Sequence, residues 1–268
     1  NGRFKQLFPK LELGLHAMNQ MQDMVAVVTG ASRGLGKAIA LEFAGEGASV
    51  AICARANSPT GLTGTMDETA RAIRDAGGEV FPLVCDVTDD GQVREMVRQV
   101  EERYGRIDVL FNNAGAMVLG ESILEIDPAS WDRIMTVNVR GPYLCSRAVL
   151  PIMMRQRRGS IINIGSRMAD DPTQGGGVLY STSKAAVHMF SFCLADEVRK
   201  YNVAVNVLSP GSLRTEGSAA IPWTQRDWHE RVEPSEVGPS AVYLAKQDAQ
   251  SLTGQLVLRA EFGKTWGM

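Results

Sequence analysis

The sequence predicts one α/β domain built on a doubly wound, parallel sheet of about seven strands. Short apolar runs rich in β-branched residues alternate with helical patterns from residue 24 to the C-terminal end. Strands that alternate with helices in this way form a parallel sheet with helices on both faces. The 268 residues, of which 44% are hydrophobic, suffice for one large domain with a sizeable core.

Each predicted strand is a short apolar run of the kind that is buried on both faces of a sheet. The seven runs span residues 24–30, 49–54, 79–87, 108–115, 160–166, 203–211 and 254–260. Between them lie longer stretches with helical periodicity, at residues 36–47, 66–78, 92–105, 139–157, 178–200 and 235–246. Right-handed crossovers would bring the C-terminal end of every strand to one edge of the sheet, where ligands bind.

The first 22 residues are interpreted as an N-terminal extension or as residues added for expression, and residues 23–268 as the folded domain. The extension has neither the apolar core nor the small-residue cleavage site of a secretory signal. No apolar run in the chain approaches the ~20 residues of a membrane span, so no membrane partner is expected.

Composition and charge exclude several classes of protein. A net charge of −2 gives no basic surface for nucleic acid or for an anionic membrane. The three histidines and four cysteines are too scattered for a metal site or a disulfide framework. The cysteines lie in apolar stretches, so all four are interpreted as reduced core thiols of a cytoplasmic protein: Cys53, Cys85, Cys145 and Cys193.

A glycine-rich turn, Thr29–Gly36, joins the first predicted strand to the first predicted helix. Glycine permits positive φ angles and a close approach of the backbone to a ligand. The first turn of the helix offers unpaired N–H groups and the positive end of the helix dipole to a phosphate. The spacing is G-x-x-x-G-x-G, so the turn matches the mechanism of a dinucleotide loop without matching the G-x-G-x-x-G pattern.

The same residues allow two other interpretations. Gly30–Gly34 reads G-x-S-x-G, the nucleophile elbow of serine hydrolases, with Ser32 as the nucleophile. That interpretation lacks an earlier strand for the oxyanion loop and an evident histidine partner, since His188 lies in a helix and His229 in a loop. The turn could also be a tight connection that binds nothing.

The motifs, taken in order, resemble those of the short-chain dehydrogenase/reductase family from about Met24 to Gly254. They are TGASRGLG, CDV, NNAG, the Asn of TVNVRG, the Ser of IINIGS, YSTSK and NVLSPGSLRT. Each fragment alone is weak, but the order and spacing together are specific. The resemblance is greatest to the ketoacyl-thioester reductase and carbonyl reductase branches. It implies a Rossmann-type fold and hydride transfer between a nicotinamide and a carbonyl or secondary alcohol carbon.

The resemblance assigns catalytic roles to Asn138, Ser166, Tyr180 and Lys184. Tyr180 is implied to be the general acid/base, Lys184 to lower its pKa and hold the nicotinamide ribose, and Ser166 to polarise the carbonyl. Asn138 is implied to kink its helix and to anchor a water that links Lys184 to solvent. A phenol with an ordinary pKa near ~10 is a poor base at neutral pH, and a nearby ammonium favours the phenolate. Taken alone, each residue could be a cap, a core aromatic or a solvated charge.

NADP(H) is the expected cofactor. The second strand ends in Cys53-Ala54-Arg55, with none of the acidic residues that grip the ribose 2′-hydroxyl of NAD. Arginine pairs with a 2′-phosphate, and in the family a base at Arg33 or Arg55 implies NADP(H). Asp86 is implied to hold the adenine amino group, and Thr215 to lie near the carboxamide. The implied cofactor contacts are Gly30, Ser32, Arg33, Gly34, Leu35, Gly36, Arg55, Asp86, Val87, Asn113, Gly115, Tyr180, Lys184, Pro210, Gly211, Leu213 and Thr215.

For the substrate and the oligomeric state, the sequence leaves alternatives open. The segment after Thr215 occupies the substrate-lid position of the family, and its tryptophans could either cover an apolar substrate or pack the lid. The candidate substrate contacts are Ser166, Met168, Gln174 and Trp223. A homotetramer or homodimer built on helices 139–157 and 178–200 is implied, although the usual Asp-Gly-Gly after the last strand is absent. Two other functions stay open: a cofactor-binding sensor without catalysis and a specific 3-ketoacyl-thioester reductase.

Overall fold

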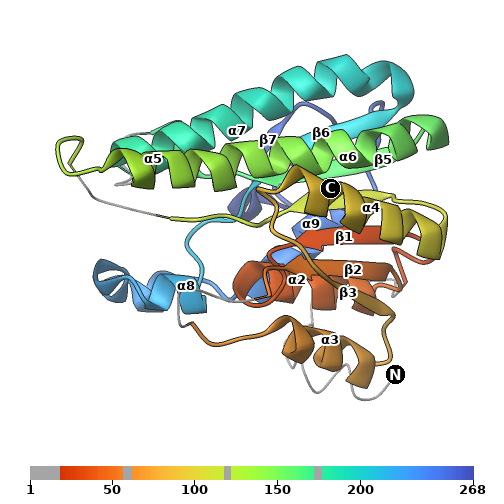
Figure 1. The fold of residues 1–268 in the computed structure, drawn as a ribbon, viewed down its shortest axis with the longest axis horizontal. Coiled ribbons are helices and arrows are strands. Elements are labelled where there is room, and N and C mark those ends of the chain that lie inside the picture. The colour runs from red at the N-terminus through yellow and green to blue at the C-terminus, as the bar shows by residue number, and fades with distance from the viewer. Residues whose placement is uncertain (1–18, 57–61, 118–121, 172–176) are drawn as a thin grey trace.

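The computed structural model describes residues 19–56, 62–117, 122–171 and 177–268, with the backbone alone at 222 and 223. It contains a seven-stranded parallel sheet with the strand order β3-β2-β1-β4-β5-β6-β7, covered by helices on both faces (Figure 1). The predicted doubly wound, Rossmann-type fold is therefore confirmed.

The strands are short and mostly inaccessible to solvent. Their bounds are β1 Val25–Thr29, β2 Ser49–Ala54, β3 Val80–Val84, β4 Val109–Asn112, β5 Gly159–Ile164, β6 Val203–Ser209 and β7 Leu256–Leu258. Every residue of β1, β4 and β6 is buried, because these strands lie between two layers of helices. The apolar runs of the sequence predicted all seven, and the predicted bounds differ from the observed ones mainly at the strand ends.

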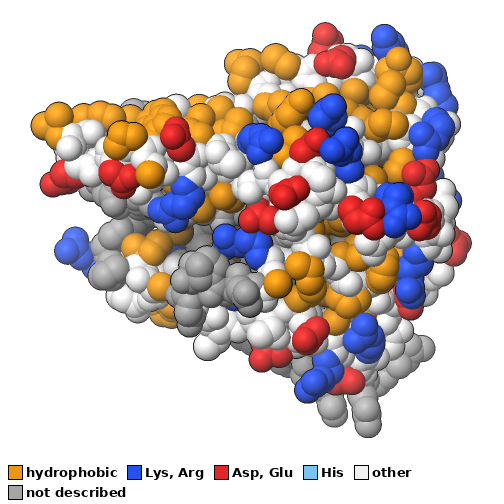
Figure 2. All heavy atoms as spheres, in the orientation of Figure 1, with side chains coloured by type: hydrophobic (Ala, Val, Ile, Leu, Met, Phe, Trp, Pro, Cys, Tyr) orange, Lys and Arg blue, Asp and Glu red, His pale blue; other side chains and the backbone are white. Residues whose placement is uncertain are grey.

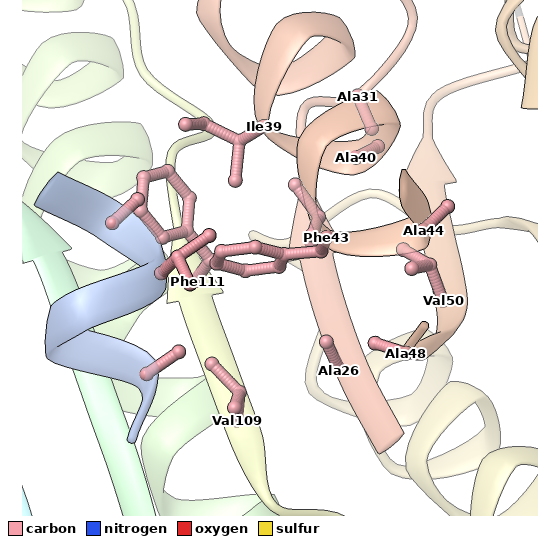
Figure 3. Packing of buried hydrophobic residues seen from close by; sticks show 14 of the residues in the cluster. Ala26, Ala31, Ile39, Ala40, Phe43, Ala44, Ala48, Val50, Val109 and Phe111 are labelled. Carbon is pink, nitrogen blue, oxygen red and sulfur yellow. The ribbon is translucent and has the colours of Figure 1, made fainter. Parts of the chain in front are cut away.

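The helices form two layers. Their bounds are α2 Gly34–Gly45, α3 Met66–Asp75, α4 Asp90–Tyr104, α5 Pro128–Met135, α6 Gly141–Gln156, α7 Gly177–Val198, α8 Glu216–Ala219 and α9 Gly238–Ala245. One layer contains α3, α2 and α9, and the other contains α4, α6 and α7, with α6 and α7 side by side in Figure 1. Each layer buries its own apolar cluster against the sheet. In the first cluster the rings of Phe43 and Phe111 meet edge to face at 5.9 Å (Figure 3).

A ladder of polar side chains crosses the second apolar cluster. The Asn112 amide on β4 donates to Asn163 Oδ1 on β5 over 2.8 Å, and the Asn163 amide donates to Ser191 Oγ on α7 over 2.8 Å. Ser191 in turn donates to the Val187 carbonyl. All three side chains are buried, and each finds a partner, as buried polar groups require.

Three observations depart from the sequence-based expectations. Helix α5 was not predicted, although Asp127 caps it and Pro128 opens it, which is a start signal that the sequence carries. Met21 is fully buried, so the core begins before the predicted boundary at residue 23. Cys193 is exposed on α7, whereas the other three cysteines are buried as expected. In the described parts of the chain, no helix has the length and apolar character needed to cross a membrane.

Candidate active site

Four strand ends bring the predicted site residues to one edge of the sheet. The glycine loop follows β1, residues 113–116 follow β4, Ser166 follows β5 and residues 210–215 follow β6. The order of the strands reverses between β1 and β4, which is where ligands bind in open α/β sheets. On the face seen in Figure 2, the surface is hollowed between the end formed by α5 and α7 and the segment that contains α8.

The glycine loop requires glycine for two reasons: some of its φ angles are positive, and some of its positions have no space for a side chain. Gly30 and Gly34 have φ angles of 66° and 54°. A Cβ atom on Gly36 would lie 2.3 Å from the Gly30 carbonyl oxygen and 2.5 Å from Asn113 Nδ2. The loop therefore folds tightly on itself at the start of α2, where the first N–H groups of a helix can bind a phosphate.

The loop is fastened to β4 by two polar side chains. Thr29 Oγ1 accepts from the N–H groups of Asn113 and Ala114, each over 3.0 Å. The Asn113 amide donates to the carbonyls of Thr29 and Gly30 over 2.9 and 3.1 Å. Asn113 is one of the implied cofactor contacts, and in the structure its amide holds the glycine loop. Thr29 had no predicted role, although it opens the TGASRGLG motif.

A carboxylate already occupies one N–H group of the loop. Glu216 Oε2, at the start of α8, accepts from the Gly34 N–H over 3.0 Å. Thr215 caps α8 by accepting from the Ser218 N–H over 3.0 Å, so its hydroxyl is held by the lid segment. An oxyanion at the first turn of α2 is what a pyrophosphate would supply, so the turn fits a dinucleotide. Glu216 was not predicted, and only its position after the P-G-x-x-x-T motif could have suggested it.

The other expected cofactor contacts border this loop. Arg55 is exposed just after β2, and Arg33 Nη2 donates to the Gly64 carbonyl over 2.9 Å. Asp86, just after β3, accepts from the Thr88 N–H and hydroxyl over 2.9 and 2.7 Å, while Val87 is buried. Gly211 has a φ angle of 82° with open space around its Cα. The structure thus gathers these residues at the ends of β1, β2, β3 and β6.

Helix α7 presents Tyr180 and Lys184 to the end of β5, one helical turn apart. The Ser166 and Tyr180 side chains are hydrogen-bonded to each other. Lys184 is buried, and its Nζ donates to the Ile164 carbonyl over 2.7 Å and lies 5.7 Å from the centre of the Tyr180 ring. The structure therefore brings the three implied catalytic side chains together.

The pKa values of this pair differ from the expected pattern. Burial raises the pKa of Tyr180 to about 12, although the hydrogen bond with Ser166 acts to lower it. Burial also lowers the pKa of Lys184 to about 8. Lys184 was expected to lower the pKa of Tyr180, whereas the two causes that act on this phenol are burial, which raises its pKa, and the Ser166 hydroxyl, which lowers it. Each group is thus shifted toward its neutral form, so Tyr180 is a protonated phenol at neutral pH.

Asn138 lies in a five-residue π-helix, Thr136–Arg140, between α5 and α6. Only 2% of it is exposed. Its Oδ1 accepts from the Ala116 N–H over 2.8 Å, and its amide donates to the Ala116 carbonyl over 2.9 Å and to Ser183 Oγ over 3.0 Å. Ser183 also donates to the Tyr180 carbonyl over 2.8 Å. Asn138 therefore ties the loop after β4 to the first turn of α7, through a serine that the sequence analysis did not single out.

The sequence model of the short chain dehydrogenase family matches residues 24–225. The chain belongs to the short-chain dehydrogenase/reductase family.

Two curated relatives cover almost the whole chain. An uncharacterized oxidoreductase of Staphylococcus saprophyticus is 36% identical over 90% of this chain and 99% of its own. A 3-oxoacyl-(acyl-carrier-protein) reductase of Thermotoga maritima is 32% identical over 89% of this chain and 96% of its own.

Solved structures of the family superpose closely. A putative short-chain dehydrogenase/reductase from Burkholderia xenovorans has a TM-score of 0.81 and 32% identity, over 90% of this chain and 96% of its own. A metagenomic short-chain oxidoreductase in complex with NADP has a TM-score of 0.73 and 34% identity, over 89% of this chain and 98% of its own. The fold and the family are thus supported independently of the site geometry.

The substrate side of this short-chain dehydrogenase/reductase is only partly described. Met168 is half-buried in the 3-10 turn Arg167–Ala169, and its N–H donates to Ser166 Oγ over 3.2 Å. Gln174 lies outside the described residues, as does the side chain of Trp223. A hollow of about 650 Å³ lies between α2 and the lid segment, lined by residues that include Lys37, Arg214, Thr215, Glu216 and Trp228. It borders Gly34, and neither Ser166 nor Tyr180 lines it.

The described contacts do not support Ser32 as a hydrolytic nucleophile. His188 Nε2 accepts from the Ser166 N–H, and His188 Nδ1 lies 3.3 Å from Asp170 Oδ1. His229 is exposed beside Glu230. His188 is therefore engaged with Ser166 and Asp170, and the family membership agrees with a nucleotide-binding turn.

Proposed function

We propose that the protein is an NADP(H)-dependent oxidoreductase that reduces a carbonyl group, or oxidises the matching secondary alcohol, with Tyr180 as the general acid/base. One observation carries the proposal: the hydroxyls of Ser166 and Tyr180 are hydrogen-bonded at the end of β5, where the buried Lys184 also bonds to the strand and lies 5.7 Å from the Tyr180 ring. Two neighbouring hydroxyls of this kind suit a single carbonyl oxygen, which can accept a hydrogen bond from one and a proton from the other.

The chain offers a distinct group for each part of a nicotinamide dinucleotide. The Gly34–Gly36 turn would hold the pyrophosphate, Asp86 the adenine, and Lys184 the ribose next to the nicotinamide. When bound, the dinucleotide supplies or accepts the hydride. Ser166 then donates a hydrogen bond to the carbonyl oxygen while Tyr180 gives it a proton. Because the pKa of Tyr180 is raised to about 12, its hydroxyl is protonated at neutral pH and carries the proton that reduction requires.

NADP(H) is proposed over NAD(H) on the charges that follow β2. Arg55 stands where an acid would grip a 2′-hydroxyl, and Arg33 lies on the neighbouring loop. A relative that is 34% identical has been solved with NADP bound. Buried cysteines that form no disulfide agree with a reducing compartment such as the cytoplasm.

A cofactor comparison tests this choice. We expect Arg55→Ala to raise the KM for NADPH about tenfold or more, since a charge-assisted phosphate contact is worth about 1.5–3 kcal/mol. The KM for NADH should stay nearly constant. Arg158→Ala, an exposed arginine next to the opposite end of β5, is the control. Equal use of NADPH and NADH by the wild-type protein contradicts the proposal.

The substrate class can be narrowed by a screen of NADPH oxidation over simple ketones, diketones, 3-ketoacyl thioesters and sugars. The Thermotoga relative acts by name on a 3-oxoacyl carrier protein, which favours ketoacyl thioesters as one arm. Turnover confined to that arm supports a specific 3-ketoacyl-thioester reductase. No turnover in any arm contradicts the enzyme and favours a cofactor-binding sensor.

We infer that the protein assembles as a homodimer or homotetramer through α6 and α7. Both helices carry apolar side chains that are exposed in the single chain, Tyr143 on α6 and Val178 and Met189 on α7. Figure 2 shows hydrophobic side chains along the side of the molecule that α6 and α7 form. Light scattering coupled to size exclusion measures the mass, and a monomer at micromolar concentration contradicts the inference.

A further inference from the structure

His188 lies beneath Ser166 and bonds to its backbone. Its Nε2 accepts from the Ser166 N–H over 3.3 Å, and its Nδ1 lies 3.3 Å from Asp170 Oδ1. The His188 side chain is 5% exposed, whereas that of Asp170 is 53% exposed. A Cβ atom on Gly165 would lie 2.5 Å from His188 Nε2, so the ring sits directly against the strand backbone.

The contacts fix the tautomer of His188. An Nε2 atom that accepts from a backbone N–H carries no hydrogen, so the ring proton is on Nδ1 and is donated to Asp170. Burial lowers the pKa of His188, and the charge of Lys184 acts in the same direction, while Asp170 raises the pKa. These are the charged groups that act on the ring. Gly165 separates the ring from Val207 on β6, since a Cβ on this glycine would touch both side chains, and on α7 the ring of Phe192 lies 6.4 Å from that of His188.

Three side chains of one stripe on α7 hold the end of β5. Tyr180, Lys184 and His188 are spaced by four residues and so lie on one face of the helix. They bond to the Ser166 side chain, the Ile164 carbonyl and the Ser166 N–H. Ser166 is thus held by α7 at both its backbone and its hydroxyl.

Asp170 closes the turn that follows. Ser166 caps the 3-10 turn Arg167–Ala169, and the Ala169 and Asp170 N–H groups bond back to the carbonyls of Ser166 and Arg167 over 3.1 Å. The bond from His188 to Asp170 therefore fastens both ends of this turn to α7. The arrangement is not a hydrolytic triad, because His188 meets the backbone of Ser166 and not its hydroxyl.

We propose that His188 and Asp170 form a positioning pair that holds Ser166 and the turn 166–170 in their carbonyl-binding arrangement, and that protonation of His188 releases this hold. The proposal rests on the proposed reductase function. A protonated imidazole would place an N–H group against the Ser166 N–H, and two donors repel. Ser166 would then shift away from Tyr180, and turnover would fall on the acid side of the pH profile.

The test compares kcat and KM from pH 5 to 9 in three variants. H188Q keeps an acceptor for the Ser166 N–H and does not titrate, so its kcat should stay within about fivefold of wild type (about 1 kcal/mol). Its acid limb should vanish. H188L has no acceptor, so its kcat should fall by about 10- to 100-fold at every pH, with the KM for NADPH unchanged. D170N removes a charge that favours the imidazolium, so its acid limb should move to lower pH.

Wild-type kcat and an unaltered acid limb in H188L overturn the proposal. An acid limb that stays in H188Q, or that does not move in D170N, overturns the pH dependence. If H188L does not fold, the pH profiles of kcat in H188Q and D170N decide whether the proposal holds.

The His188–Asp170 pair can be tested even if the protein has no reductase activity. If the wild-type protein reduces nothing with NADPH, the reductase is rejected. Nitrogen-15 NMR of the histidine rings then still tests the pair, which requires the neutral Nδ1–H form of His188 at pH 7. It also requires a pKa below the ordinary value of about 6.5 that falls further in D170N. A charged ring at pH 7, or an Nε2–H tautomer, overturns the pair whatever the activity.

Discussion

The two halves of the candidate site are built in different ways. The half that follows β1 depends on backbone: glycines with positive φ, a helix N-terminus, and loop carbonyls held by Asn113. The half that follows β5 depends on side chains from one stripe of α7 that bond to the strand end. The first half therefore has no room for an added Cβ atom at Gly30 or Gly36. The second tolerates changes of equal shape but not the loss of a functional group.

The largest expected effect is on the α7 half. Tyr180→Phe removes one hydroxyl and keeps the ring, so the fold and the Kd for NADPH should stay near wild type. Turnover should fall by about 10²- to 10⁴-fold, the usual contribution of a general acid. Stopped-flow NADPH oxidation measures the loss. Tyr201→Phe, in the turn that follows α7, is the control, and turnover in Tyr180→Phe at the wild-type rate contradicts the assignment.

The glycine-loop half should be sensitive to steric overlap, so an added methyl group should lower both its stability and its affinity for NADPH. Gly36→Ala places a Cβ 2.3 Å from the Gly30 carbonyl oxygen, where backbone would have to move. We expect a loss of about 1–3 kcal/mol of stability from the added atom. NADPH binding should weaken by about tenfold or more (1.4 kcal/mol). Calorimetry and fluorescence titration measure both.

The matched control for this change is Gly217→Ala, where the only atom near the added Cβ, Thr215 Oγ1, is 3.8 Å away. Its melting temperature should equal or exceed that of wild type. If Gly36→Ala also keeps the wild-type stability and NADPH affinity, the loop does not depend on close backbone packing.

A third test concerns the pH dependence of stability on the glycine-loop side, where α2 carries a partly buried carboxyl. Burial and the neighbouring Glu46 raise the pKa of Glu42 on α2 from 4.5 to about 7. The folded chain then binds this proton more tightly than the unfolded chain, so stability falls as pH rises from about 4.5 to about 7. Glu42→Gln should stabilise the protein at pH 8 by up to about 3 kcal/mol and have little effect near pH 4.5.

Thermal unfolding at both pH values checks this prediction. Glu197→Gln changes an exposed carboxylate on α7 and should be neutral at both. An equal effect of Glu42→Gln at pH 4.5 and pH 8 argues against a carboxyl that titrates near neutrality.

The smallest expected effect concerns the contact between the lid and the loop. Glu216 holds the Gly34 N–H that a pyrophosphate would use, and its charge opposes that of the phosphates. Glu216→Gln should therefore tighten NADPH binding by about threefold, since partly exposed charge interactions are worth under about 1 kcal/mol. Isothermal titration at low salt measures the Kd, and weaker binding shows that Glu216 helps rather than opposes the cofactor.

The sequence predicted the backbone-dependent half more completely than the side-chain half. Glycine spacing and apolar runs are local, so the loop and all seven strands could be located without coordinates. Tyr180, Lys184 and Ser166 came from the family motifs, and the structure brings them together. His188 could not be found, because its partners Ser166 and Asp170 meet α7 only once β5 is in the sheet. The raised pKa of Tyr180 likewise depends on burial, which no spacing encodes.

The Asn112–Asn163–Ser191 ladder has a consequence for how the chain selects one sheet. Asn112 and Asn163 are register partners, and Ile161 points to the same face of β5 as Asn163. A slip of two residues would keep every side chain on its own face, so the apolar pattern alone does not forbid it. It would, however, set Ile161 against the Asn112 amide and break the bond between Asn112 and Asn163, and a buried polar group left without its partner costs about 1–3 kcal/mol. The ladder thus fixes the register of β5 against β4, and this register determines where Ser166, which follows the strand, lies relative to Tyr180.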